Sequence, residues 1–119
     1  MSEVHVGEWS GEEQRRHKRV PLHVPVECRP RGDAVLSAHC ENISISGLLV
    51  RCADPFPEDT EVSLSFELPG SGRITTNARV AHMVPAVFMG LEFDGLPEES
   101  RTRIERYVEA TDPVAKTRS

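Results

Sequence analysis

The chain has 119 residues, with 14 lysines and arginines against 19 aspartates and glutamates, and a formal net charge of -5 at pH 7. This length corresponds to one ordinary domain with its own core, and the acidic balance argues against general binding of DNA or RNA. Apolar runs stop far below the roughly 20 residues that a membrane-spanning helix needs. The N-terminus lacks the features of a secretory signal, so we expect a cytoplasmic protein without membrane insertion.

Residues 1–14 are polar, rich in glycine and glutamate, and include the single tryptophan Trp9. They predict a flexible N-terminal segment. From residue 22 the pattern changes to the period-2 alternation of a half-buried strand. Pro25 lies within this run, and it cannot donate a ladder hydrogen bond, which predicts an edge position or a bulge. The apolar residues of this first strand are Leu22, Val24, Val26 and Cys28.

Further strand-like runs follow, each bounded by turn residues. They cover residues 34–42, 47–53, 60–69, 73–84 and 85–93. The alternation predicts that Leu64, Phe66, Leu91 and Phe93 lie in the core. Six antiparallel strands at this short spacing favour a small β-barrel or a curled sandwich, and periodicity does not choose between the two.

The last element changes to a helical period. Pro97 stands at an early helical position, acidic residues follow in the first turn, and apolar residues recur at i, i+3 and i+4. The spacing predicts one amphipathic helix over 97–110 that covers one opening of the barrel, with Ile104, Tyr107 and Val108 facing inward. Residues 111–119 predict a frayed tail.

Cys28, Cys40 and Cys52 stand at even 12-residue intervals without a C-x-x-C pair. This spacing matches neither a disulfide framework nor a familiar zinc site. We expect three reduced thiols, buried or half-buried, with no metal bound between them. A metal site that combines His39 with Cys40 is disfavoured, because adjacent residues on a strand point to opposite faces.

Two short stretches stand out. The first, RRHKR at 15–19, places four cationic side chains in five positions just before the first strand. The second, NISISG at 42–47, lies where the second and third strands meet. Taken alone, a basic cluster is usually solvated surface charge, and a stretch of Asn, Ser and Gly is usually a polar turn. His82 in the fifth run is interpreted as strand surface.

Together the two stretches resemble the PilZ domain family, which is marked by an R-x-x-x-R arm followed by [D/N]-x-S-x-x-G. Arg15 and Arg19 match the arm, and Asn42, Ser44 and Gly47 match the second motif. ARV and GLEF in the last two strand runs, and the helix after them, also follow the family order. Each motif alone is weak, but both in order on a six-strand pattern are specific.

The resemblance implies a six-stranded antiparallel β-barrel closed by a C-terminal α-helix, all-β apart from that one helix. The domain would extend over 15–110, including the arginine-rich arm, between the flexible segments 1–14 and 111–119. It also implies that the barrel binds cyclic di-GMP, a bacterial second messenger, without catalysis, cofactor or metal. We expect a monomer or weak dimer that passes the signal to an effector protein, for example in motility or surface behaviour.

Family membership further implies the residues that contact the nucleotide. An arginine guanidinium can stack on guanine, bind its O6 and N7 edge, or grip a phosphate. An asparagine offers a donor and an acceptor, a serine can donate to phosphate, and a glycine permits close backbone approach or positive φ. Arg16 and Lys18, which lie between the two motif positions, should contribute less, through screened attraction. The candidate ligand residues are Arg15, Arg16, Arg19, Asn42, Ser44 and Gly47.

Two departures from the family pattern bear on affinity. Asn42 stands where an aspartate is common, and Ser46 stands where a second glycine often precedes Gly47. One alternative is therefore a PilZ-like module that docks proteins and has weak or lost nucleotide binding. An enzyme is poorly supported, because no nucleophile elbow, P-loop, HExxH or dinucleotide fingerprint occurs in the sequence.

Overall fold

The computed structural model describes residues 18–31 and 35–111. Arg15 and Arg16 therefore lie outside the described residues, as does Trp9. The predicted flexible N-terminal segment and nearly all of the predicted frayed tail also fall outside them.

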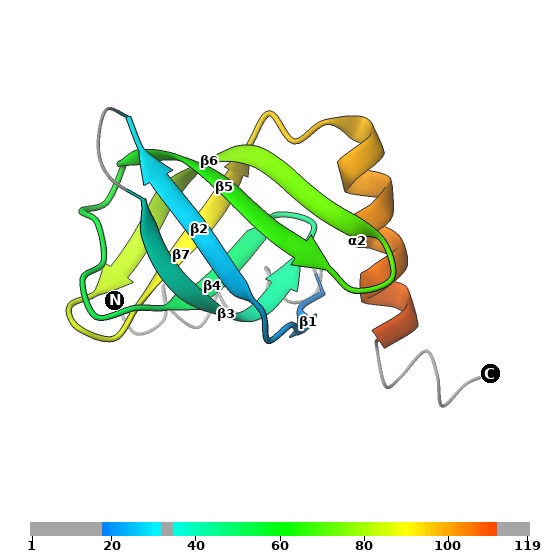
Figure 1. The fold of residues 1–119 in the computed structure, drawn as a ribbon, viewed down its shortest axis with the longest axis horizontal. Coiled ribbons are helices and arrows are strands. Elements are labelled where there is room, and N and C mark those ends of the chain that lie inside the picture. The colour runs from blue at the N-terminus through cyan, green and yellow to red at the C-terminus, as the bar shows by residue number, and fades with distance from the viewer. Residues whose placement is uncertain (1–17, 32–34, 112–119) are drawn as a thin grey trace, which may run out of the picture.

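Six strands close into an antiparallel barrel (Figure 1). Each strand pairs with the next in the order β3, β2, β5, β6, β7 and β4, and β4 pairs back with β3 to complete the ring. This closure confirms the predicted barrel and removes the exposed edges that an open sheet would have. The strands are β2 (Pro25–Pro30), β3 (Leu36–Ser44), β4 (Gly47–Arg51), β5 (Glu61–Leu68), β6 (Gly72–Val84) and β7 (Phe88–Asp94).

A short additional strand, β1 (Val20–Pro21), precedes β2 and pairs with the same side of β3. The backbone between β1 and β2 stays hydrogen-bonded to β3, since Leu22 N–H donates to the Glu41 carbonyl and Val24 accepts from Cys40 N–H. Pro25 is the first residue of β2 and pairs only with β3, because the pairing with β5 begins at Val26. Proline lacks an N–H, and at this position no hydrogen bond of the sheet is lost.

The core follows the predicted alternation along most strands. Leu64 and Phe66 of β5 and Leu91 of β7 are buried. Phe93 is only partly buried, because it lies next to the end of β7, and Val87 lies in the turn before β7 and is 46% exposed. Phe93, which was predicted to lie in the core, packs against the core cluster from its edge. The three cysteines are free and buried in the same core.

Helix α2 (Glu98–Thr111) packs across one end of the barrel (Figure 1). Ile104 and Val108 are buried in the core cluster, as the period predicted. Tyr107 is half-buried, and its hydroxyl donates to the Pro21 carbonyl at 3.0 Å. The guanidinium of Arg103 donates a hydrogen bond to the carbonyl of Ser71, which ties the helix to the β5–β6 turn. Among the described residues, no helix is long and apolar enough to cross a membrane.

Candidate functional site

Two β-bulges shape one outer face of the barrel. In β3, the pairing with β4 shifts register between Cys40 and Asn42, so that Glu41 is the extra residue. In β6, the pairing with β7 shifts between Val80 and His82. A bulge re-aims the side chains that follow it. The first bulge leaves Glu41 and Asn42 both partly exposed, although they are neighbours in the strand.

Beyond these bulges, one row of cross-strand partners runs over β3, β4, β7 and β6. Asn42 pairs with Leu49, Leu49 pairs with Gly90, and Gly90 pairs with His82. Leu49 points outward, since its neighbours Leu48 and Val50 are fully buried. The imidazole of His82 lies directly over Gly90, in the space that a side chain at Gly90 would occupy. The row therefore runs from the amide of Asn42 at one end to the imidazole of His82 at the other.

Arg19 joins this row from the segment that leads into β1. Its guanidinium NH1 donates a hydrogen bond to Oδ1 of Asn42 at 2.9 Å. Arg19 also lines a small cavity of about 80 Å³ together with His82, Gly90 and Ser46. The structure therefore brings together one residue from each of the two sequence motifs.

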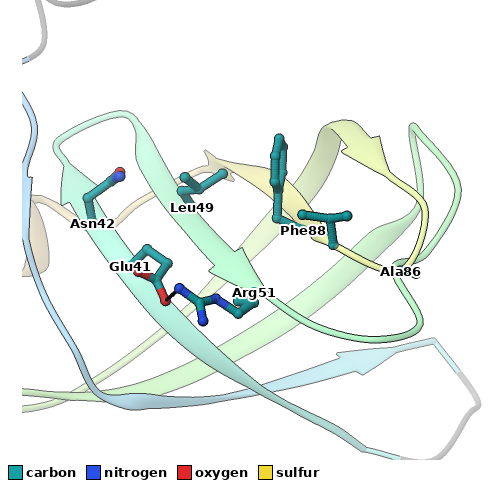
Figure 2. Close-up of a pocket in the computed structure, with 7 residues that line it drawn as sticks. Glu41, Asn42, Leu49, Arg51, Ala86 and Phe88 are labelled. Carbon is teal, nitrogen blue, oxygen red and sulfur yellow. Dashed lines mark ion pairs between the residues drawn. The ribbon is translucent and has the colours of Figure 1, made fainter.

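A larger open pocket of about 600 Å³ adjoins the same row. Its size lies within the range of small-molecule sites. Figure 2 shows Asn42, Leu49 and Phe88 projecting along one side of the sheet, from β3, β4 and β7. Glu41 and Arg51 lie beside them and form an ion pair at 3.0 Å, with the Arg51 side chain 69% exposed. The pocket thus offers an amide, apolar and aromatic surface, and one accessible guanidinium.

Ser44 of the second motif is the last residue of β3. It is fully buried, and its hydroxyl oxygen accepts from the Ser46 backbone N–H at 3.0 Å and shares a 2.7 Å hydrogen bond with the Ser46 hydroxyl. These bonds define the two-residue turn between β3 and β4. The structure therefore places this hydroxyl in the β3–β4 turn, and Ser44 is not among the residues that line the open pocket.

Strand β7 passes so close to Gly47 that no side chain fits at this position. A Cβ at this position would overlap the carbonyl oxygen of Leu91 in β7. The sequence offered two reasons for a glycine at this position, a close backbone approach or a positive φ. The structure shows the close backbone approach. The approaching backbone is the protein's own β7, which pairs with β4.

Sequence reasoning missed part of this surface. Leu49, Arg51 and Phe88 line the large pocket, and His82, interpreted from the sequence as strand surface alone, lines the small one. The sequence predicted a strand over 47–53 without assigning its faces, and the neighbour order of the strands and the two bulges decide which outward residues meet. Those are properties of the closed barrel and are not visible in a local pattern.

The model of the PilZ domain family matches residues 13–110, so the chain belongs to this family. The family predicted from the two motifs is confirmed. No curated protein sequence matches the chain.

Solved PilZ structures share the fold. The Bacillus subtilis inhibitor of motility, MotI/DgrA, has a TM-score of 0.70 at 22% identity, over 79% of this chain and 49% of that one. The PilZ domain of YcgR from Escherichia coli with c-di-GMP has a TM-score of 0.70 at 11% identity, over 88% of this chain and 96% of that one. Borreliella burgdorferi PlzA in complex with c-di-GMP has a TM-score of 0.63 at 19% identity, over 88% and 45%. The chain therefore spans about half the length of MotI and PlzA and nearly all of the YcgR domain.

Proposed function

We propose that the protein is a cytoplasmic receptor for cyclic di-GMP that carries no enzymatic activity and passes the signal to an effector protein. The observation that carries this proposal is the hydrogen bond between Arg19 and Asn42, which joins the two PilZ motifs at the rim of an open pocket of about 600 Å³. YcgR and PlzA, which share the fold, have been solved with c-di-GMP.

The side chains around the pocket match the chemistry of this ligand. A guanine base has an apolar face and an O6 and N7 edge, and a guanidinium or an amide can recognise that edge. Arg19 and Asn42 supply these groups, and Leu49 and Phe88 supply surface for a base face. Arg51 is exposed enough to reach a phosphate. We assign the remaining contacts to Arg15 and Arg16 of the arm.

A second candidate function is a docking module for a protein partner. Val84 and Val87, which are 39% and 46% exposed, lie at the β6–β7 turn beside the pocket. Exposed apolar residues next to a ligand site are suited to contact an effector. The same surface would serve a receptor that signals through that effector, so nucleotide titration distinguishes the two candidates.

The test is isothermal titration of the full chain with cyclic di-GMP, and with GMP as a mononucleotide control. Saturable binding of cyclic di-GMP that is weakened by Arg15→Ala and Arg19→Ala supports the receptor. Arg101→Ala removes the same charge from the outer face of α2, where Arg101 pairs with Glu105, and should bind as wild type. An absence of saturable binding at high micromolar ligand rejects the receptor in favour of the docking module.

A further inference from the structure

Two histidines and a glutamate converge on the outside of the barrel next to the nucleotide pocket. His23 lies between β1 and β2, His39 lies in β3, and Glu41 is the extra residue of the β3 bulge. One ligand atom from each of the three side chains lies within 4.8 Å of the others. Both imidazoles are exposed, and the glutamate is partly buried. No step of the proposed nucleotide binding uses the two histidines.

The backbone explains why these side chains meet. Leu22 N–H donates to the Glu41 carbonyl, and Cys40 N–H donates to the Val24 carbonyl, so His23 is held alongside β3 between these two bonds. The imidazoles of His23 and His39 stack with centroids 6.0 Å apart and an interplanar angle of 15°. The cluster is therefore assembled by strand pairing before any ion arrives.

We propose that His23, His39 and Glu41 form a binding site for a divalent transition-metal ion of the Zn²⁺ type. Two imidazole nitrogens and a carboxylate oxygen are ligands that Zn²⁺ takes at about 2.0–2.2 Å, with a fourth position open to water. Small rotations of exposed side chains bring the three atoms from their present separation to these distances. Imidazole ligands favour Zn²⁺ and its first-row neighbours over Mg²⁺ and Ca²⁺, which prefer oxygen.

Arg51 competes with a bound metal ion for the carboxylate of Glu41. Its guanidinium lies 3.0 Å from Oε2 of Glu41. A cation bound to the Glu41 carboxylate is repelled by that guanidinium at short range. Removal of the Arg51 charge should therefore strengthen metal binding, whereas loss of a ligand should weaken it. A general effect of surface charge gives the same signs at Arg51 and Glu41, so the losses expected on removal of the His23 or His39 imidazole are what separate direct coordination from it.

The inference goes beyond the proposed nucleotide binding and does not depend on it. Glu41 directly precedes Asn42 in β3, so the ion would lie beside the pocket without using the Arg19 contact. The buried thiols of Cys28 and Cys40 are fully enclosed and do not reach this surface.

The test is calorimetric titration of the untagged full chain with Zn²⁺, with Mg²⁺ as a control ion and with the histidine ring resonances followed by NMR. One Zn²⁺ should bind per chain, and the rings of His23 and His39 should shift. His23→Ala, His39→Ala and Glu41→Gln should each weaken binding at least about tenfold. Arg51→Gln should tighten it, and Mg²⁺ should give no saturable heat.

Matched controls locate the ion. His82→Ala removes another imidazole of the outer surface and should leave Zn²⁺ affinity unchanged. A variant with His5→Ala and His17→Ala should also bind as wild type, and circular dichroism of every variant should show the native fold. The proposal is overturned if the His23 and His39 variants retain wild-type affinity, or if the loss of affinity follows His82, His5 or His17.

Discussion

The guanidinium of Arg19 and the side-chain oxygen of Asn42 are 2.9 Å apart, although 23 positions separate the two residues in sequence. The short strand β1 brings them together, because Val20 pairs with Ile43 and Pro21 pairs with Asn42. Arg19 directly precedes β1, so it emerges beside Asn42. Arg19, the last residue of the first motif, is thus held beside the second motif by a strand of two residues.

Arg19→Ala should weaken cyclic di-GMP binding about tenfold to a hundredfold, which corresponds to the roughly 1 to 3 kcal/mol of a good guanidinium contact to a base edge. Asn42→Ala should act in the same direction. Because the two side chains are bonded to each other, the double variant should lose less than the sum of the single losses. Calorimetric titration of all three variants measures this coupling, and strictly additive losses would show that the two residues bind the nucleotide independently.

Gly90→Ala tests the surface between the two cavities. A methyl group at this position would overlap the His82 ring, which must then swing away from β7. The ring is the flexible part, so the free energy of unfolding should change little while nucleotide affinity falls. In the Gly90→Ala background, a further His82→Ala substitution should cause no additional loss. Urea unfolding and nucleotide titration of the same samples check both expectations, and wild-type affinity in Gly90→Ala would remove His82 and Gly90 from the site.

Much of the fold was predictable, since period-2 alternation is a local signal and marked the six barrel strands and their buried positions. Ring closure depends on pairing between β3 and β4 and between β4 and β7. Periodicity did not distinguish a closed barrel from a curled sandwich, and the resemblance to the PilZ family predicted the closed barrel. The site was less predictable. Ser44 carries the motif but is fully buried, whereas Leu49 and His82 carry no motif and lie on the pocket surface, because register and bulges select them.

Ser44→Ala should lower the free energy of unfolding by about 1 to 3 kcal/mol, because the Ser46 N–H and hydroxyl lose a buried partner. Any loss of nucleotide affinity should follow from the altered turn. Ser37→Ala, on the exposed outer side of the same strand, is the matched control and should unfold as wild type. Urea unfolding measures both. A Ser44→Ala protein with wild-type stability and lost nucleotide binding would instead place this hydroxyl on the ligand.

Gly47→Ala should be more damaging to the fold. The added methyl would overlap the Leu91 carbonyl oxygen, and two paired backbones cannot separate without breaking the barrel ladder. We expect a loss of about 3 kcal/mol or more, at the upper end of overpacking effects. Gly70→Ala is the control, because Gly70 has φ of 78° but nothing within 4 Å of the added methyl. Its cost should stay near 1 kcal/mol. Thermal unfolding ranks the two variants, and equal stabilities would contradict the close approach.

The buried thiols should make stability fall at alkaline pH. Burial raises the pKa of Cys28 and of Cys40 from the ordinary 9.0 to about 12, so the folded protein keeps protons that the unfolded chain releases. Their contribution to stability is full below pH 9 and is lost as the pH rises from 9 toward 12. Each pH unit in this window costs about 1.4 kcal/mol per thiol.

Urea unfolding at intervals from pH 8 to pH 10.5 measures this slope. Cys40→Ala should be less stable than wild type at pH 8, because it leaves a cavity, but its stability should fall less steeply above pH 9. Lysine and tyrosine ionisation is common to both proteins and cancels in the comparison. Parallel curves for wild type and Cys40→Ala would mean that this thiol does not remain protonated in the folded barrel.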